Sequence, residues 1–174
     1  MPKPRPKPVA RDGKRRGQVA ELAFMHKAAD LGFAVTKPYG DDEPYDFILD
    51  SGRRLWRVQV KSTESGFMGQ HYYCVRSGHC NAGQRRKTYT SDEIDFLVVY
   101  IVPCDAWYVI PVSELGSRAN IYLYPENPAS RGRFERYREA WCLMACPRHG
   151  KPRDDIAVEH RCQSCPSPQP PEPN

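Results

Sequence analysis

Apolar and polar residues alternate most regularly in two neighbouring segments of the chain, residues 45–50 and residues 55–61. Both segments are rich in β-branched and aromatic residues, and residues 51–54 (SGRR) between them are typical of a turn. The pattern therefore predicts a β-hairpin, with one strand on either side of a short turn.

One face of the predicted hairpin is apolar and the other is polar, because successive side chains of a strand point to opposite faces. In the second strand the apolar residues are Trp56, Val58 and Val60, and the polar ones are Arg57, Gln59 and Lys61. With a four-residue turn Asp46 lies opposite Gln59, and with a two-residue turn it lies diagonally across from it on the same face. In both cases Asp46, Gln59 and Lys61 converge.

Residues 17–31 show the period of an amphipathic helix. Ala20, Phe24 and Leu31 lie on one stripe, and Glu21 lies on the adjoining stripe among apolar neighbours. A carboxylate on the inner flank of a helix is costly unless a metal ion or another cation meets it. Glu21 is thus a candidate ligand, and the alternative is that it lies at the edge of the stripe and reaches water.

The rest of the chain adds strands and one further helix. Residues 71–76, 94–102, 107–110 and 121–124 are predicted to be strands. The second of these is almost continuously apolar, which favours a strand that is covered on both faces. Residues 133–145 are predicted to form a helix, because four large apolar residues fall on one face at helical spacing: Phe134, Tyr137, Trp141 and Met144. The expected architecture is a mixed α/β sandwich.

At 174 residues, the chain is long enough for one domain with its own core plus terminal tails. No apolar stretch approaches the length of a membrane span, and no apolar segment follows the N-terminal charges as it would in a secretion signal. We therefore expect a cytoplasmic protein that has no membrane partner.

The net charge of +5 is concentrated at the N-terminus. Residues 1–16 hold seven basic residues and one acidic residue, and prolines alternate through residues 2–8, which favours an extended, disordered arm. Such an arm suits contacts with a phosphate backbone or a minor groove, although a solvated tail without a partner fits it equally well. Candidate nucleic-acid contacts are Arg15 and Arg16 of this segment and Arg85, Arg86 and Lys87 of a later loop.

The polar residues of the hairpin have the chemistry of a site for a hard divalent cation. Mg²⁺ is held by one or two carboxylates together with neutral oxygens, and it polarises a phosphoryl oxygen and acidifies a bound water. Asp46 offers the carboxylate, while the amide oxygen of Gln59 and the backbone carbonyl of Val60 offer neutral ligands. Lys61 can orient the attacking water or neutralise the charge that develops on the phosphate. The alternative is an ordinary hairpin with a solvated polar face.

The order of these elements, a helix with Glu21, a strand with Asp46 and a strand with Gln59-Val60-Lys61, resembles the PD-(D/E)XK nuclease superfamily. It is similar in particular to the branch with glutamine in the last motif, found among group I intron homing endonucleases and related bacterial proteins. The resemblance covers roughly residues 14–145. Further segments that carry it are YDFILD at 45–50, RVQVKS at 57–62, IDFLVVY at 94–100, WYVIP at 107–111 and EAW at 139–141.

The resemblance implies a restriction-endonuclease-like α/β fold, in which a mixed β-sheet is flanked by helices. It implies that Glu21, Asp46 and Gln59 bind Mg²⁺ or Mn²⁺ and that Lys61 has a catalytic role. It also implies DNA as the substrate. Because one site cuts one strand, double-strand cleavage requires a homo-oligomer, either a dimer or a tetramer.

The chain departs from the family pattern in two places. The usual Pro-Asp dipeptide is Tyr45-Asp46 here, with Pro44 one position early, and the acidic member of the last motif is Gln59. An amide binds a divalent cation more weakly than a carboxylate does, because it carries no negative charge. We expect a metal-dependent DNA endonuclease, and the alternative is a non-catalytic nucleic-acid-binding module with a degenerate site.

The C-terminal residues contain a second candidate metal site. Two pairs, Cys146 with His149 and Cys162 with Cys165, have the spacing of the ligands in a small Zn²⁺ ribbon. The alternative is a disordered tail with reactive thiols, which its proline-rich end favours. The sequence thus divides into a basic arm at residues 1–13, an endonuclease domain at residues 14–145 and a cysteine- and histidine-containing tail at residues 146–174.

Overall fold

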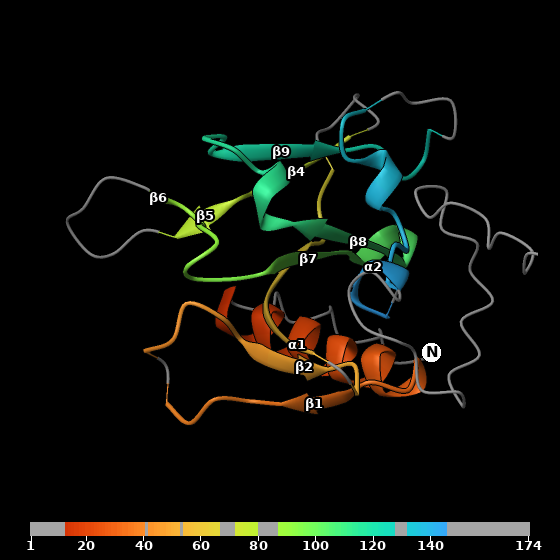
Figure 1. Ribbon diagram of the computed structural model, residues 1–174. Coiled ribbons are helices and arrows are strands. Elements are labelled where there is room, and N and C mark those ends of the chain that lie inside the picture. The colour runs from red at the N-terminus through yellow and green to blue at the C-terminus, as the bar shows by residue number, and fades with distance from the viewer. Residues whose placement is uncertain are drawn as a thin grey trace, which may run out of the picture.

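In the part of the chain that the structure describes, a long helix packs against a mixed β-sheet (Figure 1). This computed structural model describes residues 13–40, 42–52, 54–66, 72–79, 87–127 and 132–145. The helices are α1 (Gly13–Asp30) and α2 (Cys142–Ala145), with 3-10 helices η1 (Val102–Cys104), η2 (Val112–Glu114) and η3 (Glu135–Tyr137). The strands are β1 (Ala34–Thr36), β2 (Phe47–Asp50), β3 (Leu55–Thr63), β4 (Tyr73–Arg76), β5 (Gly78–His79), β6 (Lys87–Thr88), β7 (Phe96–Ile101), β8 (Ala106–Pro111) and β9 (Asn120–Leu123).

The main sheet has five strands in the order β1-β2-β3-β7-β8. Strands β3 and β7 are parallel, and the other neighbouring pairs are antiparallel. Asp50 pairs with Leu55, so the connection between β2 and β3 is the four-residue turn at residues 51–54. The predicted hairpin is confirmed, and its register is the one that places Asp46 opposite Gln59.

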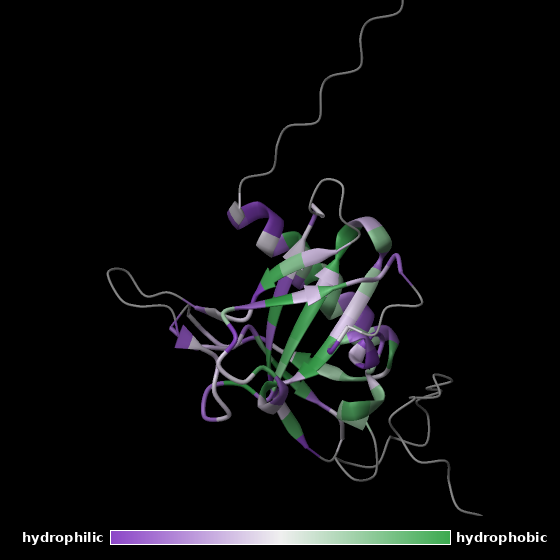
Figure 2. Cartoon of the chain, turned by 90° about the horizontal axis from the view of Figure 1, so that it is seen from above, coloured by the Kyte–Doolittle hydropathy of each residue, from purple (hydrophilic) through white to green (hydrophobic). Residues whose placement is uncertain are grey.

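Two apolar clusters cover the opposite faces of this sheet. Alternation along β7 divides its side chains between them, with Phe96 and Val98 on the side of α1 and Leu97 and Val99 on the other side. Figure 1 shows α1 on one side of β7 and β8, and β4 with β9 on the other. In Figure 2 the strands between these layers are mostly hydrophobic. The prediction that residues 94–102 form a strand covered on both faces is confirmed.

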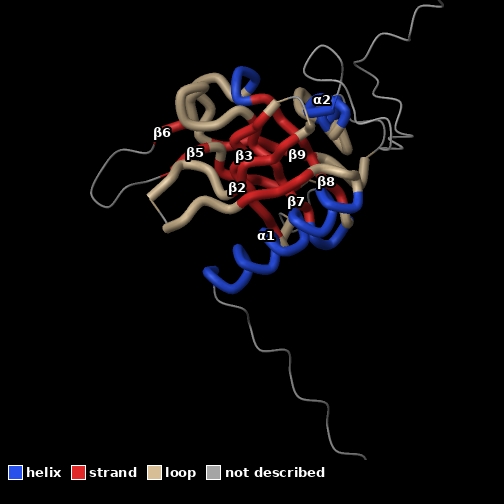
Figure 3. Tube along the Cα trace, turned by 60° about the horizontal axis from the view of Figure 1, so that its bottom comes forward, coloured by secondary structure: helices blue, strands red, loops and turns tan. Residues whose placement is uncertain are grey.

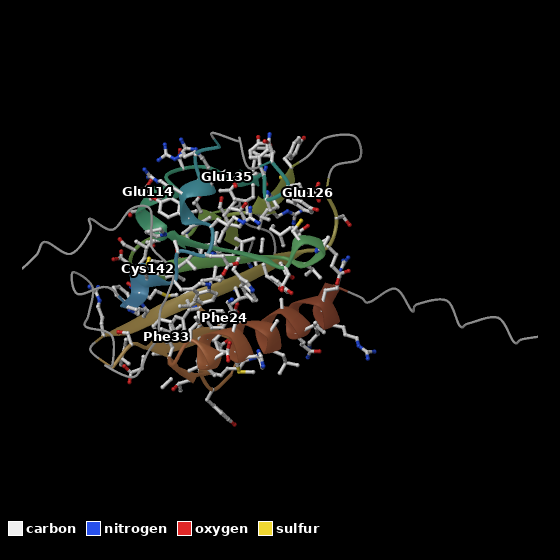
Figure 4. All side chains as sticks on the ribbon, turned by 90° about the vertical axis from the view of Figure 1, so that its right-hand side faces the viewer. Phe24, Phe33, Glu114, Glu126, Glu135 and Cys142 are labelled. Carbon is white, nitrogen blue, oxygen red and sulfur yellow. The ribbon has the colours of Figure 1, made fainter. Side chains whose placement is uncertain are left out.

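Helix α1 buries one stripe of side chains against the sheet, and Ala23 and Met25 beside this stripe are partly buried. Ala20, Phe24 and Ala28 are buried, and the ring of Phe24 stacks on that of Phe47 with centroids 5.0 Å apart. Figure 4 shows Phe24 between the helix and the sheet. The helix begins at Gly13, earlier than the predicted residue 17, because its first turn is exposed and polar and so shows no apolar period.

The second face of the main sheet is covered by a smaller antiparallel pair, β4 with β9, in which Cys74 pairs with Tyr122. The predicted strands at residues 71–76 and 121–124 correspond to these two elements. Strands β5 and β6 form a further short pair that the sequence pattern did not predict. A Cβ atom on Gly78 would lie 2.0 Å from the backbone oxygen of Lys87, so only glycine permits this close approach.

The predicted helix at residues 133–145 is wrong. The chain instead forms η3, an isolated bridge from Arg138 to Tyr108 of β8, and then α2. Glu139 has a φ of 48° in the left-handed region, and its N–H donates to the carbonyl of Trp107 at 2.7 Å. The four apolar side chains therefore serve two faces of the sheet rather than one face of a helix: Phe134 and Tyr137 lie in the cluster beside β4 and β9, and Trp141 and Met144 lie in the cluster beside α1.

Several segments predicted from composition lie outside the described residues. These are residues 1–12 of the basic arm, Arg85 and Arg86 of the basic loop, and the candidate zinc ligands Cys146, His149, Cys162 and Cys165. Within the residues that the structure describes, no helix is both long enough and apolar enough to span a membrane.

Candidate active site

A cleft of about 520 Å³ lies between the N-terminal half of α1 and the second half of β3. Figure 3 shows α1 lying against one side of the strands. All five residues predicted from the sequence as metal ligands or catalytic groups line this one cleft: Glu21, Asp46, Gln59, Val60 and Lys61. They come from α1, from the residue before β2 and from β3, so three separate elements meet at a single site.

Asp46 directly precedes β2 and is held in place by the ladder between β2 and β3. Its backbone N–H donates to the carbonyl of Val58 at 2.9 Å, which extends the pairing by one residue beyond the strand. The carboxylate oxygen Oδ2 accepts the backbone N–H of Val60 at 2.8 Å and also the side-chain amide of Gln59. The carboxylate is therefore fixed against β3 by two donors.

Gln59 is buried, and its amide nitrogen lies between two oxygen atoms. Nε2 donates to Oδ2 of Asp46 and, at 3.3 Å, to the backbone carbonyl of Val60. Both of these oxygens are candidate metal ligands. The positive end of the amide dipole thus takes the place that a small cation would take. Only a turn of the amide group would present its oxygen to a metal ion instead.

The environment of Asp46 disfavours its ionised form. Burial is the main cause and raises the pKa of Asp46 above 3.8, and the nearby charge of Glu21 raises it further. The hydrogen bond from Val60 and the positive charges of Lys61 and Lys37 oppose this effect without cancelling it. A buried carboxylate beside a second carboxylate is an arrangement that a divalent cation would relieve.

Lys61 is the cation on the opposite side of the cleft from α1. Burial lowers the pKa of Lys61, and the charge of Asp46 counteracts part of this shift. The ammonium nitrogen lies 5.7 Å from the centroid of the Tyr89 ring, within the range of a cation–π contact. Burial and the charge of Asp46 raise the pKa of Tyr89, so its hydroxyl stays protonated. Sequence reasoning missed Tyr89, because the segment after β6 carries no motif.

Glu21 meets a cation that the sequence did not point to. Nζ of Lys37 lies 2.6 Å from Oε2 of Glu21, and the Glu21 side chain is 24% exposed. Lys37 directly follows β1, a three-residue edge strand that has no distinctive pattern. Glu21 is thus met by a cation, and its partly exposed side chain also reaches solvent, so it combines features of both interpretations.

The other polar residues that the sequence singled out differ in whether they line the cleft. Arg16 lines the cleft near the start of α1, and Arg15 is an exposed residue of the same turn. Lys87 is the exposed first residue of β6 and is not part of the cleft wall. Arg57, on the same face of β3 as Gln59, instead binds Asp95, with its guanidinium nitrogen 3.3 Å from the carboxylate.

The donor atoms at the cleft fit a hard divalent cation. The ligands predicted from the sequence offer two carboxylates, one backbone carbonyl and one amide oxygen, all of them oxygen ligands of the kind that Mg²⁺ and Mn²⁺ prefer, and the carboxylate residue Glu64 also lines the cleft. Among the described residues, no three His, Cys, Asp or Glu side chains gather as a metal site. A metal ion at this cleft would therefore rely on neutral oxygens for part of its coordination.

Comparison with known proteins gives three results. The family model described as PD-(D/E)XK endonuclease matches residues 11–144. The structure of the bacterial homing endonuclease I-Ssp6803I matches with a TM-score of 0.69 and 31% identity, covering 77% of this chain and 93% of that chain. Hjc, a Holliday junction resolvase from the archaeon Archaeoglobus fulgidus, matches with a TM-score of 0.41 and 17% identity, covering 63% of this chain and 88% of that one. No curated protein matches the chain.

The match to the homing endonuclease confirms the expected fold class, a restriction-endonuclease-like mixed sheet with helices. The identity is high enough, and the coverage broad enough, that the match shows relationship as well as shared shape.

Proposed function

The chain belongs to the PD-(D/E)XK endonuclease family, and we propose that it is a divalent-metal-dependent DNA endonuclease that hydrolyses phosphodiester bonds. One observation carries this proposal. Glu21, Asp46, Gln59, the Val60 carbonyl and Lys61 line one cleft, although they come from a helix and two strands. An ordinary hairpin with a solvated polar face would have no reason to bury Gln59 and to face a second carboxylate across a cleft.

The residues of the cleft divide the chemistry between them. Mg²⁺ or Mn²⁺, when bound, supplies charge stabilisation at the phosphoryl oxygen and lowers the pKa of a water. Asp46 and Glu21 provide the negative charge that attracts the cation, and Gln59 and Val60 provide neutral oxygens. Lys61, whose pKa is lowered by burial and partly restored by the charge of Asp46, orients the attacking water and offsets the negative charge that grows on the phosphate.

The approach to the cleft suits a polyanion. Lys14, Arg15 and Arg16 lie in the first turn of α1, which itself holds no acidic residue, and Arg16 lines the cleft. Figure 2 shows this end of the helix as hydrophilic. Helix N-termini and basic side chains both attract phosphate groups. We propose that a DNA strand passes along this end of α1 and presents a phosphate to Asp46 and Lys61.

Double-strand cleavage requires more than one copy of the site. The described residues form one such cleft, and one cleft cuts one strand at a time. We propose that the protein acts as a homo-oligomer, a dimer or a tetramer, when it makes a double-strand break. As a monomer it would introduce nicks.

The direct test is cleavage of supercoiled plasmid and of a branched junction by wild type and Lys61→Ala in Mg²⁺, in Mn²⁺ and in EDTA. Lys27→Ala is the matched control, because Lys27 is a half-buried lysine that pairs with Glu139 at 3.6 Å and does not line the cleft. We expect metal-dependent cutting by wild type and by the control, and loss of cutting in Lys61→Ala.

The competing function is a non-catalytic nucleic-acid-binding module. The orientation of Gln59, whose amide nitrogen bridges the two candidate ligand oxygens, favours it specifically, since a site used only as a scaffold could keep this bond permanently. Binding of DNA by wild type without cutting in any metal would select this function over the endonuclease.

A further inference from the structure

Lys37 is bonded to the site without being part of the cleft wall. Its Nζ lies 2.6 Å from Oε2 of Glu21, a contact between side chains that are 55% and 24% exposed. Glu21 lines the cleft, whereas Lys37 is not among the residues that do. The ammonium group therefore supports Glu21 from outside the cleft.

The fold directs Lys37 to this position. Thr36 pairs with Ile48 in the last register position of β1 with β2, so Lys37 follows at the level of Phe47. Its ammonium nitrogen lies 5.8 Å from the centroid of the Phe47 ring, which in turn stacks on Phe24 of α1. Lys37 thus rests on a buried ring while it binds the carboxylate.

The positive charge of Lys37 offsets the repulsion between the carboxylates of Glu21 and Asp46. Glu21 and Asp46 lie close enough for their charges to interact, and like charges at short range oppose joint ionisation. Lys37 acts on both, through its bond to Glu21 and through its field at Asp46. Ligand carboxylates that are held by a hydrogen-bonded neighbour bind metal more tightly than unsupported ones.

We propose that Lys37 is a positioning residue that holds Glu21 by Oε2 and leaves Oε1 as the oxygen offered to a divalent cation. This inference rests on the proposed function, since it assigns a role within the same metal site. Lys37 is not part of the cleft wall, so we assign its effect on the bound cation mainly to its contact with Glu21. The residue is a determinant of metal affinity and not a catalytic group.

The test is titration of the full chain, free of DNA, with Mg²⁺ or Mn²⁺ in a calorimeter. We expect Lys37→Met to weaken metal binding by about tenfold, the low end of the range for such supporting partners, because Lys37 is half exposed. Lys37→Arg should restore most of the affinity, since a guanidinium can reach the same oxygen. Lys27 lies on α1, as Glu21 does, but pairs with Glu139, so Lys27→Met should leave the affinity unchanged.

A double-mutant cycle separates positioning from a general loss of charge. In a Glu21→Gln background, Lys37→Met should cause a clearly smaller loss, because the contact with Glu21 is already gone and only the field of Lys37 at Asp46 remains. Thermal unfolding in EDTA serves to show that each variant is folded.

The outcomes distinguish this inference from the proposed function. Unchanged or tighter metal binding by Lys37→Met, with wild type binding metal, would overturn the role of Lys37 and leave the endonuclease intact. An equal loss in the Glu21→Gln background would also overturn it. Failure of wild type to bind either metal would overturn both.

Discussion

Burial has different consequences in the two halves of β3. In the first half, Trp56 and Val58 are buried in the cluster beside α1, and the indole N–H of Trp56 finds an acceptor in the Met144 carbonyl at 3.0 Å. In the second half, Gln59 is equally buried but bonds Asp46, and Lys61 is half-buried with a lowered pKa. One strand thus passes from core to cleft within a single residue step.

This difference indicates that the first half of β3 stabilises the fold and that the second half costs some stability. Burying an apolar side chain stabilises a protein by about 1.5–3 kcal/mol, whereas burying a charged group costs free energy unless it is fully paired. Asp46, with its raised pKa, is incompletely compensated in the absence of a cation. The first half of β3 should therefore determine folding, and the second half should determine chemistry.

The largest effect is expected on the apolar side of this comparison. Phe24 is fully buried and its ring lies near three aromatic rings: Phe47, Trp107 and Trp141. Phe24→Ala should lower the free energy of unfolding by about 3–5 kcal/mol, because it leaves a cavity that the surrounding rings cannot close. Denaturant unfolding in EDTA measures this change without a contribution from metal.

Leu22→Ala is the matched control for Phe24, because Leu22 is an apolar residue of the same helix with 61% of its surface exposed. Its substitution should change the free energy of unfolding by no more than about 0.5 kcal/mol. Equal destabilisation by the two variants would mean that α1 does not pack on the sheet as described.

The next largest effect lies on the polar side. Asp46→Asn should reduce the rate of DNA cleavage at least about a hundredfold while leaving the fold intact, because it removes the negative charge that attracts the cation but keeps an oxygen that can accept the Val60 N–H. Single-turnover cleavage at saturating protein measures the rate. Asp50→Asn is the control: Asp50 is the last residue of β2, the strand that Asp46 precedes, and its carboxylate accepts the Gly52 N–H at 2.7 Å, which an amide oxygen can also do. A similar loss in both variants would contradict the assignment of Asp46.

The same division explains how much could be predicted from the sequence. The hairpin of β2 and β3 was predictable, because its pairing is local and its alternation follows directly from the pleat of a strand. Asp46, Gln59 and Lys61 could be placed on one face for the same reason, and the structure brings them into one cleft.

What could not be predicted depends on contacts between distant segments. The helix expected at residues 133–145 has the right spacing, but the bridge from Arg138 to β8 and the bond from Glu139 to Trp107 outweigh that local preference. Lys37 and Tyr89 reach the site from the ends of short strands, and no pattern within those strands marks them. Tertiary packing alone brings them against Glu21 and Lys61, two residues that line the cleft.

A substitution at Gln59 should trade stability of the fold for metal binding in the second half of β3. Gln59→Glu replaces the amide that donates to Asp46 with a further carboxylate at the cleft. We expect binding of Mg²⁺ to tighten on the order of tenfold, because ligand charge sets affinity, and stability in EDTA to fall, because the donor is lost. Calorimetric titration and unfolding in EDTA measure the two effects. Gln18→Glu adds the same charge on the exposed side of α1 and should alter neither.

The smallest predicted effect is the pH dependence of the polar half itself. The pKa of Asp46 is raised from 3.8 in the folded protein, so the native state binds the proton more tightly than the unfolded chain does. The resulting penalty is absent where the carboxyl is protonated in both states, grows as pH rises through the folded pKa, and is constant above it.

Asp46→Asn never ionises. In EDTA it should therefore be slightly more stable than wild type at about pH 8 and lose this advantage towards about pH 4. Saturating Mg²⁺ should reverse the order at neutral pH, since the cation stabilises only the protein that binds it. Parallel thermal unfolding of the two proteins measures both comparisons. A difference in stability that is independent of pH and of metal would mean that the ionised carboxylate of Asp46 does not destabilise the folded protein.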